Sequence, residues 1–232
     1  PPRSTLFPYT TLFRSFIGGN VAENSGGARA VKYGVTKDYV LNLEVVLPTG
    51  DIIWTGANTL KNSTGYNLTQ LMVGSEGTLG IVTKIVLKLL SKNTHNVLML
   101  VPFYKANEAC EAVSAIFRAG IVPSALEFME RDAIDWALEY IDGLNVQVKN
   151  EIQAHLLIEV DGNYPEILMA DAEKIMTVVE QFQIDDILFA DTEDEKNALW
   201  KMRRSIAEAV KANSIYKEED TVVPRYELPT LL

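Results

Sequence analysis

The sequence is poor in the features that mark several classes of protein. Its 232 residues contain one cysteine and two histidines. A single cysteine excludes an intrachain disulfide, which fits a reducing compartment. No run approaches the roughly 18 uninterrupted apolar residues of a membrane-spanning helix, and the N-terminus lacks the apolar run of a signal peptide. Acidic residues outnumber basic ones, and the net charge of −10 argues against nucleic acid as a partner.

What remains is the composition of an ordinary globular protein. The sequence is 47% hydrophobic and 22% charged, and its length suffices for one large or two small domains. Cys110 lies in a segment with the pattern of an amphipathic helix. We interpret it as a small buried hydrophobe rather than a nucleophile.

Both ends of the sequence are unusual. Residues 1–15, PPRSTLFPYTTLFRS, show neither helical nor strand periodicity. They resemble translated sequencing-adapter sequence, the alternative being a genuine mobile or disordered arm, and we leave them out of the fold. The last residues, TVVPRYELPTLL, stop without a terminating pattern, so we expect the first turn of a truncated helix at Pro229–Leu232.

Hydrophobic patterning predicts the elements of the first part of the chain. Residues 16–36 are rich in glycine, asparagine and alanine, which favours a loop. Strand-like runs at 39–47 and 52–55 flank a turn and predict a β-hairpin. A short helix is expected at 66–73 and a β-branched strand at 81–89, and the polar residues 91–93 are a candidate domain boundary.

Beyond that boundary strands and helices alternate. Strands are expected at 97–101, 125–129, 155–160 and 187–190, and helices at 104–119, 131–140, 165–182 and from 191–194 to about residue 212. This order predicts an α+β or α/β sandwich, with a ferredoxin-like arrangement as one form of it.

Two glycine-rich segments are candidates for cofactor binding. In the first, Gly18 to Gly27, paired glycines allow successive backbone N–H groups to face one anion, and Asn20 and Asn24 add amide groups. It matches neither the P-loop nor the Gly-x-Gly-x-x-Gly dinucleotide motif. In the second, Gly74 to Gly80, three glycines precede a strand. By spacing alone, the first segment could equally be a structural turn, and a tight turn entering a strand is the better explanation of the second.

A family resemblance covers both segments. The stretch GGNVAENSGGARAVKYGVTKDYVLNLEVVLPTG, followed by STGYNLTQLMVGSEGTLGIVTKIVLKL, resembles the FAD domain of the vanillyl-alcohol oxidase-type (PCMH-type) flavoproteins. It is most similar to the branch of D-lactate dehydrogenase, the glycolate oxidase D-subunit and D-2-hydroxyglutarate dehydrogenase. The resemblance implies an α+β fold, with the second half of a PCMH-type FAD-binding domain at residues 16–92. Residues 93–232 would form a truncated, ferredoxin-like C-terminal domain of the FAD-oxidase type.

The resemblance also implies roles for particular residues. Positions that match the cofactor loops are Gly18, Gly19, Asn20, Asn24, Gly26, Gly27, Gly74, Glu76, Gly77, Gly80 and Ile81. The run from Leu199 to Arg203 resembles the family's Leu-Trp-x-x-Arg helix, whose arginine would bind the substrate carboxylate. Lys217 roughly matches a second carboxylate-binding cation, although a solvated charge run explains it as well. Arg204 is expected to be solvated.

The implied reaction is FAD-dependent oxidation of a D-2-hydroxy acid, such as D-lactate or glycolate, to the 2-oxo acid. The electron acceptor is left open among a quinone, a cytochrome, an electron-transfer flavoprotein and an iron–sulfur subunit. The implied location is cytoplasmic, with peripheral attachment at the inner membrane face as an option. The family's histidine-containing motif would follow Leu232, so we expect no catalytic base and no metal site here, and an inactive fragment. His95 and His155 are expected to be ordinary surface or core residues.

Two alternatives to this function remain. One is a non-catalytic assembly subunit of a glycolate-oxidase-type complex. The other is an alcohol, sugar-lactone or aryl-ether oxidase of the same superfamily, against which the Leu-Trp-x-x-Arg stretch argues.

Overall fold

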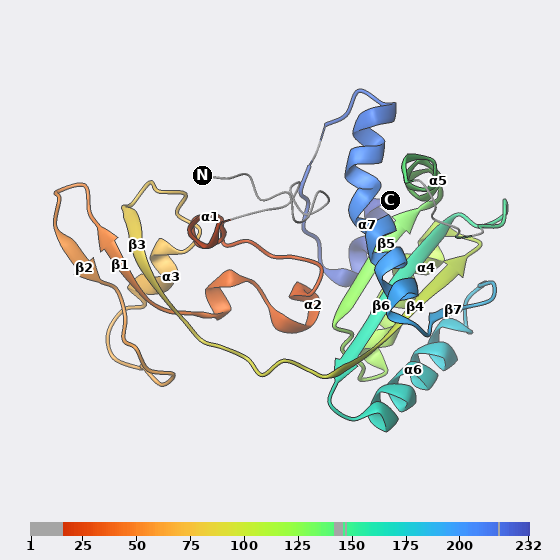
Figure 1. The fold of residues 1–232 in the computed structure, drawn as a ribbon, viewed down its shortest axis with the longest axis horizontal. Helices are drawn as coiled ribbons and strands as arrows, with labels where there is room; N and C mark the ends of the chain where they lie inside the picture. Colours follow the sequence, from red (N-terminus) through yellow and green to blue (C-terminus); the bar gives the residue numbers. More distant parts are fainter. Residues whose placement is uncertain (1–15, 142–145, 147, 218) are drawn as a thin grey trace. The chain divides into compact units, whose positions relative to one another are not determined.

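The computed structural model describes residues 16–141, 146, 148–217 and 219–232, and it divides the chain into two compact units (Figure 1). The first unit runs up to Ala30 and resumes over Gly34–Ser91. The second comprises Val31–Tyr33 and Lys92–Leu232. The division between Ser91 and Lys92 falls within the polar stretch 91–93. The adapter-like residues 1–15 lie outside the described residues.

The first unit contains a three-stranded antiparallel sheet in the order β2-β1-β3. Its strands are β1 (Val40–Val46), β2 (Ile52–Trp54) and β3 (Ile81–Leu87), which confirms the predicted hairpin and the strand after the second glycine segment. The central strand β1 carries most of the core. The core side chains are Val21, Val40, Leu43, Val45, Met72 and Val73.

The helices of this unit include one expected element and several unexpected ones. The helix α3 (Leu68–Met72) was predicted, whereas the prediction of a loop over 16–36 was wrong. That stretch forms α1 (Ile17–Glu23), α2 (Ala30–Tyr33), whose last three residues belong to the second unit, and the 3-10 helix η1 (Thr36–Asp38). Helix α1 forms despite two internal glycines because Val21 is fully buried in the core.

The second unit contains a four-stranded antiparallel sheet in the order β5-β6-β4-β7. Its strands are β4 (His95–Phe103), β5 (Ala125–Glu130), β6 (Ala154–Gly162) and β7 (Leu188–Ala190). In chain order they are interleaved with α4 (Ala106–Arg118), α5 (Arg131–Tyr140) and α6 (Pro165–Val179). The strand order is that of a ferredoxin-like fold with α5 as an additional helix. The predicted α+β class and topology are therefore confirmed.

Helices cover both faces of this sheet (Figure 1). On one face lie α4 (Ala106–Arg118) and α6 (Pro165–Val179), and on the other α5 (Arg131–Tyr140) and α7 (Glu193–Asn213). In β6, Leu156 and Ile158 pack with α4 and α6, whereas Leu157 packs with α5 and α7. Burial on both faces explains why the sequence of β6 is a continuous apolar run rather than an alternating one.

Short elements complete the second unit. The 3-10 helix η2 (Arg225–Glu227) and α8 (Leu228–Leu231) pack against α4, so the final turn is helical as predicted. Cys110 is buried on α4, as expected, and burial raises the pKa of its thiol to about 11. No helix in the described part of the chain has both the length and the apolar character needed to cross a bilayer.

His155 on β6 is a buried ionisable group whose surroundings disfavour its charged form. Its side chain is 3% exposed, and its Nδ1 has no hydrogen-bond partner among the described residues. Burial, assisted by the positive charge of Arg131, lowers the pKa of His155 to about 4. The imidazole is therefore neutral at neutral pH, as befits a core residue.

We predict that protonation of His155 makes the second unit sensitive to acid. Because the folded-state pKa is below the usual value of 6.5, the unfolded chain binds the proton first, and stability is lost as pH falls from about 6.5 towards 4. The shift corresponds to about 3 kcal/mol. Urea unfolding at pH 7 and pH 4.5 should show a smaller loss for His155→Leu than for the wild type. His95→Leu, a change at the exposed start of β4, is the control, and an equal acid response in both variants would contradict the prediction.

Candidate functional site

The two glycine segments meet in the first unit. The backbone N–H of Gly74 donates to the carbonyl of Val21, and that of Glu76 donates to the carbonyl of Ala22, each at 2.9 Å. These carbonyls belong to the last turn of α1, where the helix itself supplies no N–H donors for them. The second segment thus caps the helix formed by the first, and the two backbones form one continuous surface.

The same two segments each contain a non-glycine residue with an uncommon backbone conformation. Among the residues that the structure describes, the non-glycine positions with positive φ are Asn24, at 53°, and Glu76, at 51°. Asn24 ends α1 in the left-handed region, and its Oδ1 accepts a hydrogen bond from the Lys37 backbone N–H. Backbone strain of this kind is concentrated at functional sites.

The glycines of the two segments differ in what would surround a side chain. A Cβ on Gly80 would lie 2.6 Å from Val45 Cγ1 and 2.8 Å from the Val46 carbonyl oxygen, so packing within the unit requires glycine there. Gly74 and Gly77 have positive φ, which also favours glycine. These three positions are explained by the fold alone.

Gly18, Gly19 and Gly27 are not explained in this way. A Cβ at any of them would meet no described atom within 4 Å, and none has positive φ. Gly18 and Gly19 lie inside α1, where each glycine costs about 0.5–1 kcal/mol relative to alanine. The packing of the described residues does not require glycine at these positions. Backbone without side chains would, however, let a flat group lie close to it, as the FAD-domain resemblance implies.

The other predicted cofactor residues lie within or directly after the same two segments. Asn20 lies in α1, and Gly26 packs against Val35, whose Cγ1 would lie 3.0 Å from an added Cβ. Ile81 begins β3 and is 68% exposed. An exposed apolar side chain suits contact with the apolar face of a flavin ring.

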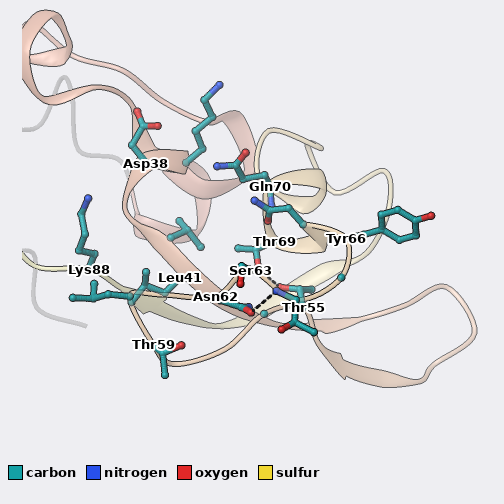
Figure 2. Close-up of a pocket in the computed structure, with 17 residues that line it drawn as sticks. Asp38, Leu41, Thr55, Thr59, Asn62, Ser63, Tyr66, Thr69, Gln70 and Lys88 are labelled. Atoms are coloured by element: carbon teal, nitrogen blue, oxygen red, sulfur yellow. Dashed lines mark hydrogen bonds between the residues drawn. The ribbon is translucent and has the colours of Figure 1, made fainter.

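A separate cavity of about 530 Å³ lies elsewhere in the first unit (Figure 2). Its wall is mostly polar, including Thr55, Asn62, Ser63, Asn67 and Gln70. The cavity shares no lining residue with the predicted cofactor positions. Sequence reasoning did not single it out, because hydroxyl and amide side chains in a loop look like ordinary solvated residues.

In the second unit, α7 carries the predicted substrate arginine. The helix starts with a capping box in which Thr192 Oγ1 accepts from the Glu195 N–H, while the Glu195 carboxylate accepts from the Thr192 N–H. Three polar side chains then follow at helical spacing on its sheet-facing stripe: Lys196, Trp200 and Arg203. Their acceptors come from three successive strands, β4, β6 and β5, and are Asn96, Glu159 and Glu127, respectively.

Arg203 is held by one edge of its guanidinium group. Its Nε donates to Glu127 Oε2 at 2.5 Å, and the two side chains are 37% and 14% exposed. The terminal nitrogens of Arg203 have no partner among the described residues. Arg203 is thus oriented, yet it retains the pair of donors that a carboxylate requires.

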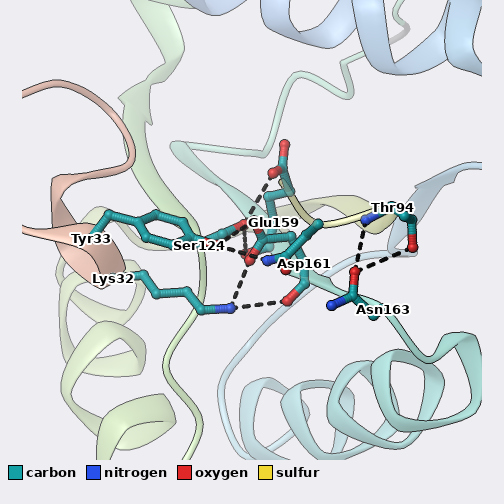
Figure 3. Close-up of polar contacts among 8 residues, drawn as sticks. Lys32, Tyr33, Thr94, Ser124, Glu159, Asp161 and Asn163 are labelled. Carbon is teal, nitrogen blue, oxygen red and sulfur yellow. Dashed lines mark hydrogen bonds and ion pairs between the residues drawn. The ribbon is translucent and has the colours of Figure 1, made fainter. Parts of the chain in front are cut away.

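Two acidic side chains on β6 accept further hydrogen bonds (Figure 3). Glu159 is fully buried, and its carboxyl group accepts from Ser124 Oγ and from Trp200 Nε1, both at 3.0 Å. Further along β6, Asp161 accepts from Lys32 Nζ at 2.6 Å and from the Tyr33 hydroxyl at 2.7 Å. These hydrogen bonds lower the pKa of Asp161 against the opposing effect of burial.

The remaining predicted cations are placed differently. Lys217 follows α7 in an extended segment with an 83% exposed side chain, and it pairs with Glu219. No hydrogen bond or ion pair among the described residues connects Lys217 with Arg203. Arg204 is exposed, as expected. In the described part of the chain, no group of three or more His, Cys, Asp or Glu side chains is arranged to hold a metal ion.

Comparison with known proteins identifies the family. Residues 92–232 match the family of FAD linked oxidases, C-terminal domain, and residues 3–56 match an FAD binding domain. The latter match includes most of the adapter-like segment. The chain therefore belongs to the FAD-linked oxidases, in the PCMH-type branch that its glycine segments resemble, and FAD is the cofactor of that family.

Individual relatives agree with this family. The chain is 40% identical over 221 residues to a D-lactate dehydrogenase of Anaerostipes hadrus, covering 93% of the chain and 46% of that protein. It is 42% identical over 221 residues to the glycolate oxidase subunit GlcD of Bacillus subtilis (strain 168), covering 94% of the chain and 46% of that protein. The chain thus spans about half the length of the curated relatives it matches.

A solved structure supports the fold. An alkyldihydroxyacetonephosphate synthase superposes with a TM-score of 0.62 at 20% sequence identity, covering 84% of this chain and 36% of that one. At this identity the likeness concerns the fold alone.

We predict that Gly19→Ala will separate fold stability from FAD binding. Alanine should stabilise α1 by about 0.5–1 kcal/mol, because it removes the entropic cost of glycine in a helix and meets open space. The added methyl group should nevertheless weaken FAD binding roughly tenfold if the flavin lies against this backbone. Thermal unfolding and titration of flavin fluorescence measure the two effects.

Ala22→Gly provides the matched control for this experiment. It loosens the same helix without adding bulk, so stability should fall. FAD affinity that is unchanged in Gly19→Ala would show that the flavin does not contact this face of α1.

Proposed function

We propose that the protein takes part in the FAD-dependent oxidation of a D-2-hydroxy acid to the corresponding 2-oxo acid. Residues 16–92 would be the C-terminal part of the FAD-binding domain, and residues 93–232 the substrate domain. Relatives named D-lactate dehydrogenase and glycolate oxidase subunit support this class of substrate.

The cofactor would be held by the joined glycine segments. The open backbone of Gly18, Gly19 and Gly27, the positive φ of Asn24 and Glu76, and the exposed Ile81 fit a large, flat, partly apolar group. When bound, FAD supplies the two-electron acceptor for the hydride that leaves the substrate Cα, while the hydroxyl proton passes to a base. No base is assigned within the chain.

The observation that carries the substrate class is the state of Arg203. A guanidinium group fixed through Nε and open at its terminal nitrogens can form two parallel hydrogen bonds with one carboxylate. The proposed role of Arg203 is to bind and orient the acid, which lowers the entropic part of the activation barrier. Lys217 is a second candidate for this role, since its side chain is accessible.

The proposal also includes an electron acceptor and a location in the cell. Electrons from the reduced flavin would pass to a quinone, a cytochrome, an electron-transfer flavoprotein or an iron–sulfur subunit. A cytoplasmic location, with or without peripheral attachment to the inner membrane face, belongs to the same proposal.

A reduction experiment tests the function. The intact protein that carries this chain is loaded with FAD and mixed without oxygen with D-lactate, glycolate or D-2-hydroxyglutarate, with L-lactate for comparison, while flavin absorbance is followed. We expect bleaching by at least one of the first three acids. Arg203→Lys should raise the substrate concentration needed by roughly tenfold to a hundredfold, because lysine keeps the charge but loses the planar fork.

Arg204→Lys is the matched control and should behave as the wild type, because Arg204 is exposed. Flavin binding without reduction by any 2-hydroxy acid would support the assembly-subunit alternative. Reduction by a primary alcohol or sugar lactone but not by the acids would support the other oxidase class.

A further inference from the structure

The contact between Arg203 and Glu127 divides the guanidinium group into two parts. Nε faces the Glu127 carboxylate at 2.5 Å, so the edge of the group that includes Nε is occupied. The end formed by the two terminal nitrogens has no partner among the described residues. A planar guanidinium group can bind anions through either side, and only the end-on side remains free here.

Both partners of this contact stand on rigid elements. Glu127 lies in the middle of β5, paired in register with Leu157 of the buried strand β6. Arg203 lies one turn beyond Trp200, which is itself bonded to the buried Glu159. The plane of the guanidinium group is therefore fixed at its Nε by one strand, while its helix is fixed by the next.

Stability does not account for this arrangement. The Arg203 side chain is more than a third exposed, and ion pairs at such positions contribute little to the free energy of folding. Accurate orientation of a long, flexible side chain has a larger effect on binding a ligand than on the fold.

We propose that Glu127 is a positioning residue, which holds Arg203 so that its terminal nitrogens present an end-on fork to the carboxylate of the acid. The proposal rests on the function proposed above. It adds a residue that acts through Arg203 and does not itself contact the substrate.

The proposal distinguishes the hydrogen bond of Glu127 from its charge. Glutamine at this position retains an oxygen that accepts from Nε, so it should preserve the orientation of Arg203. It also removes a negative charge near the incoming anion, which opposes any loss of affinity. Alanine removes the acceptor altogether and releases the guanidinium group.

The test compares Glu127→Ala, Glu127→Gln and Arg203→Lys. Two readouts are used: KM and kcat of the FAD-loaded intact protein with the 2-hydroxy acid that reduces it, and calorimetric affinity for oxalate, a carboxylate with no C–H bond to oxidise. Glu127→Ala should raise KM and weaken oxalate binding on the order of tenfold. Its kcat should change less than its KM, and Glu127→Gln should stay within about threefold of the wild type in both readouts.

Asp135→Ala is the matched control. Asp135 accepts from Arg131 Nε at 2.6 Å in another half-exposed pair on α5, so the variant loses the same kind of contact without touching Arg203. It should leave KM and oxalate affinity unchanged. A thermal unfolding curve for each variant checks that the fold is retained.

The outcomes separate this inference from the proposed function. If Arg203→Lys weakens oxalate binding and Glu127→Ala does not, Glu127 has no positioning role, although the proposed function stands. Equal losses in Glu127→Ala and Glu127→Gln, or in Asp135→Ala, would also overturn the inference. If Arg203→Lys has no effect, or the wild type binds no oxalate, the assignment of Arg203 to the substrate carboxylate fails and the inference fails with it.

Discussion

A carboxyl group that is shut off from water must find its hydrogen bonds inside the protein, and that requirement organises the second unit. Glu159, fully buried on β6, is satisfied by the Ser124 hydroxyl and by the indole N–H of Trp200. Once Trp200 is fixed over β6, helical geometry determines the strand that each neighbouring turn of α7 meets. Arg203, three residues later, therefore lies over β5, where Glu127 accepts its hydrogen bond.

The order of strands and helices in this unit could be predicted from sequence because each element has an unambiguous period. The apolar run in β6 belongs to a strand covered on both faces, and α4 and α7 show helical spacing over many residues. The spatial order β5-β6-β4-β7 then follows from the few ways in which such a chain can be connected. The ends of the strands and helices in this unit differ from the predicted ends by only a few residues, as is usual at element boundaries.

The first unit shows where local reasoning fails. The low side-chain bulk and many glycines of residues 16–36 predict a loop, yet residues 17–23 form α1. The helix is stabilised by contacts remote in sequence, namely the burial of Val21 and the bonds from Gly74 and Glu76 to the final carbonyls. In the same way, Arg203 could be found through its helix motif. Glu127 could not, because an acidic residue between apolar neighbours in a strand is indistinguishable from a solvated one until its partner is known.

The glycines of the first unit fall into two groups, those that the fold requires and those that it does not, and the second group supports the proposal of a ligand. Gly80 would bring a Cβ against the Val46 carbonyl, and Gly74 and Gly77 have positive φ, so these three are required by the fold. Gly18 and Gly19 occupy ordinary helical backbone, and no atom of the described residues would lie within 4 Å of an added Cβ, so alanine would make the isolated helix more stable. The packing of the described residues does not account for this cost at two successive positions, whereas the flavin proposed to lie on the helix backbone would.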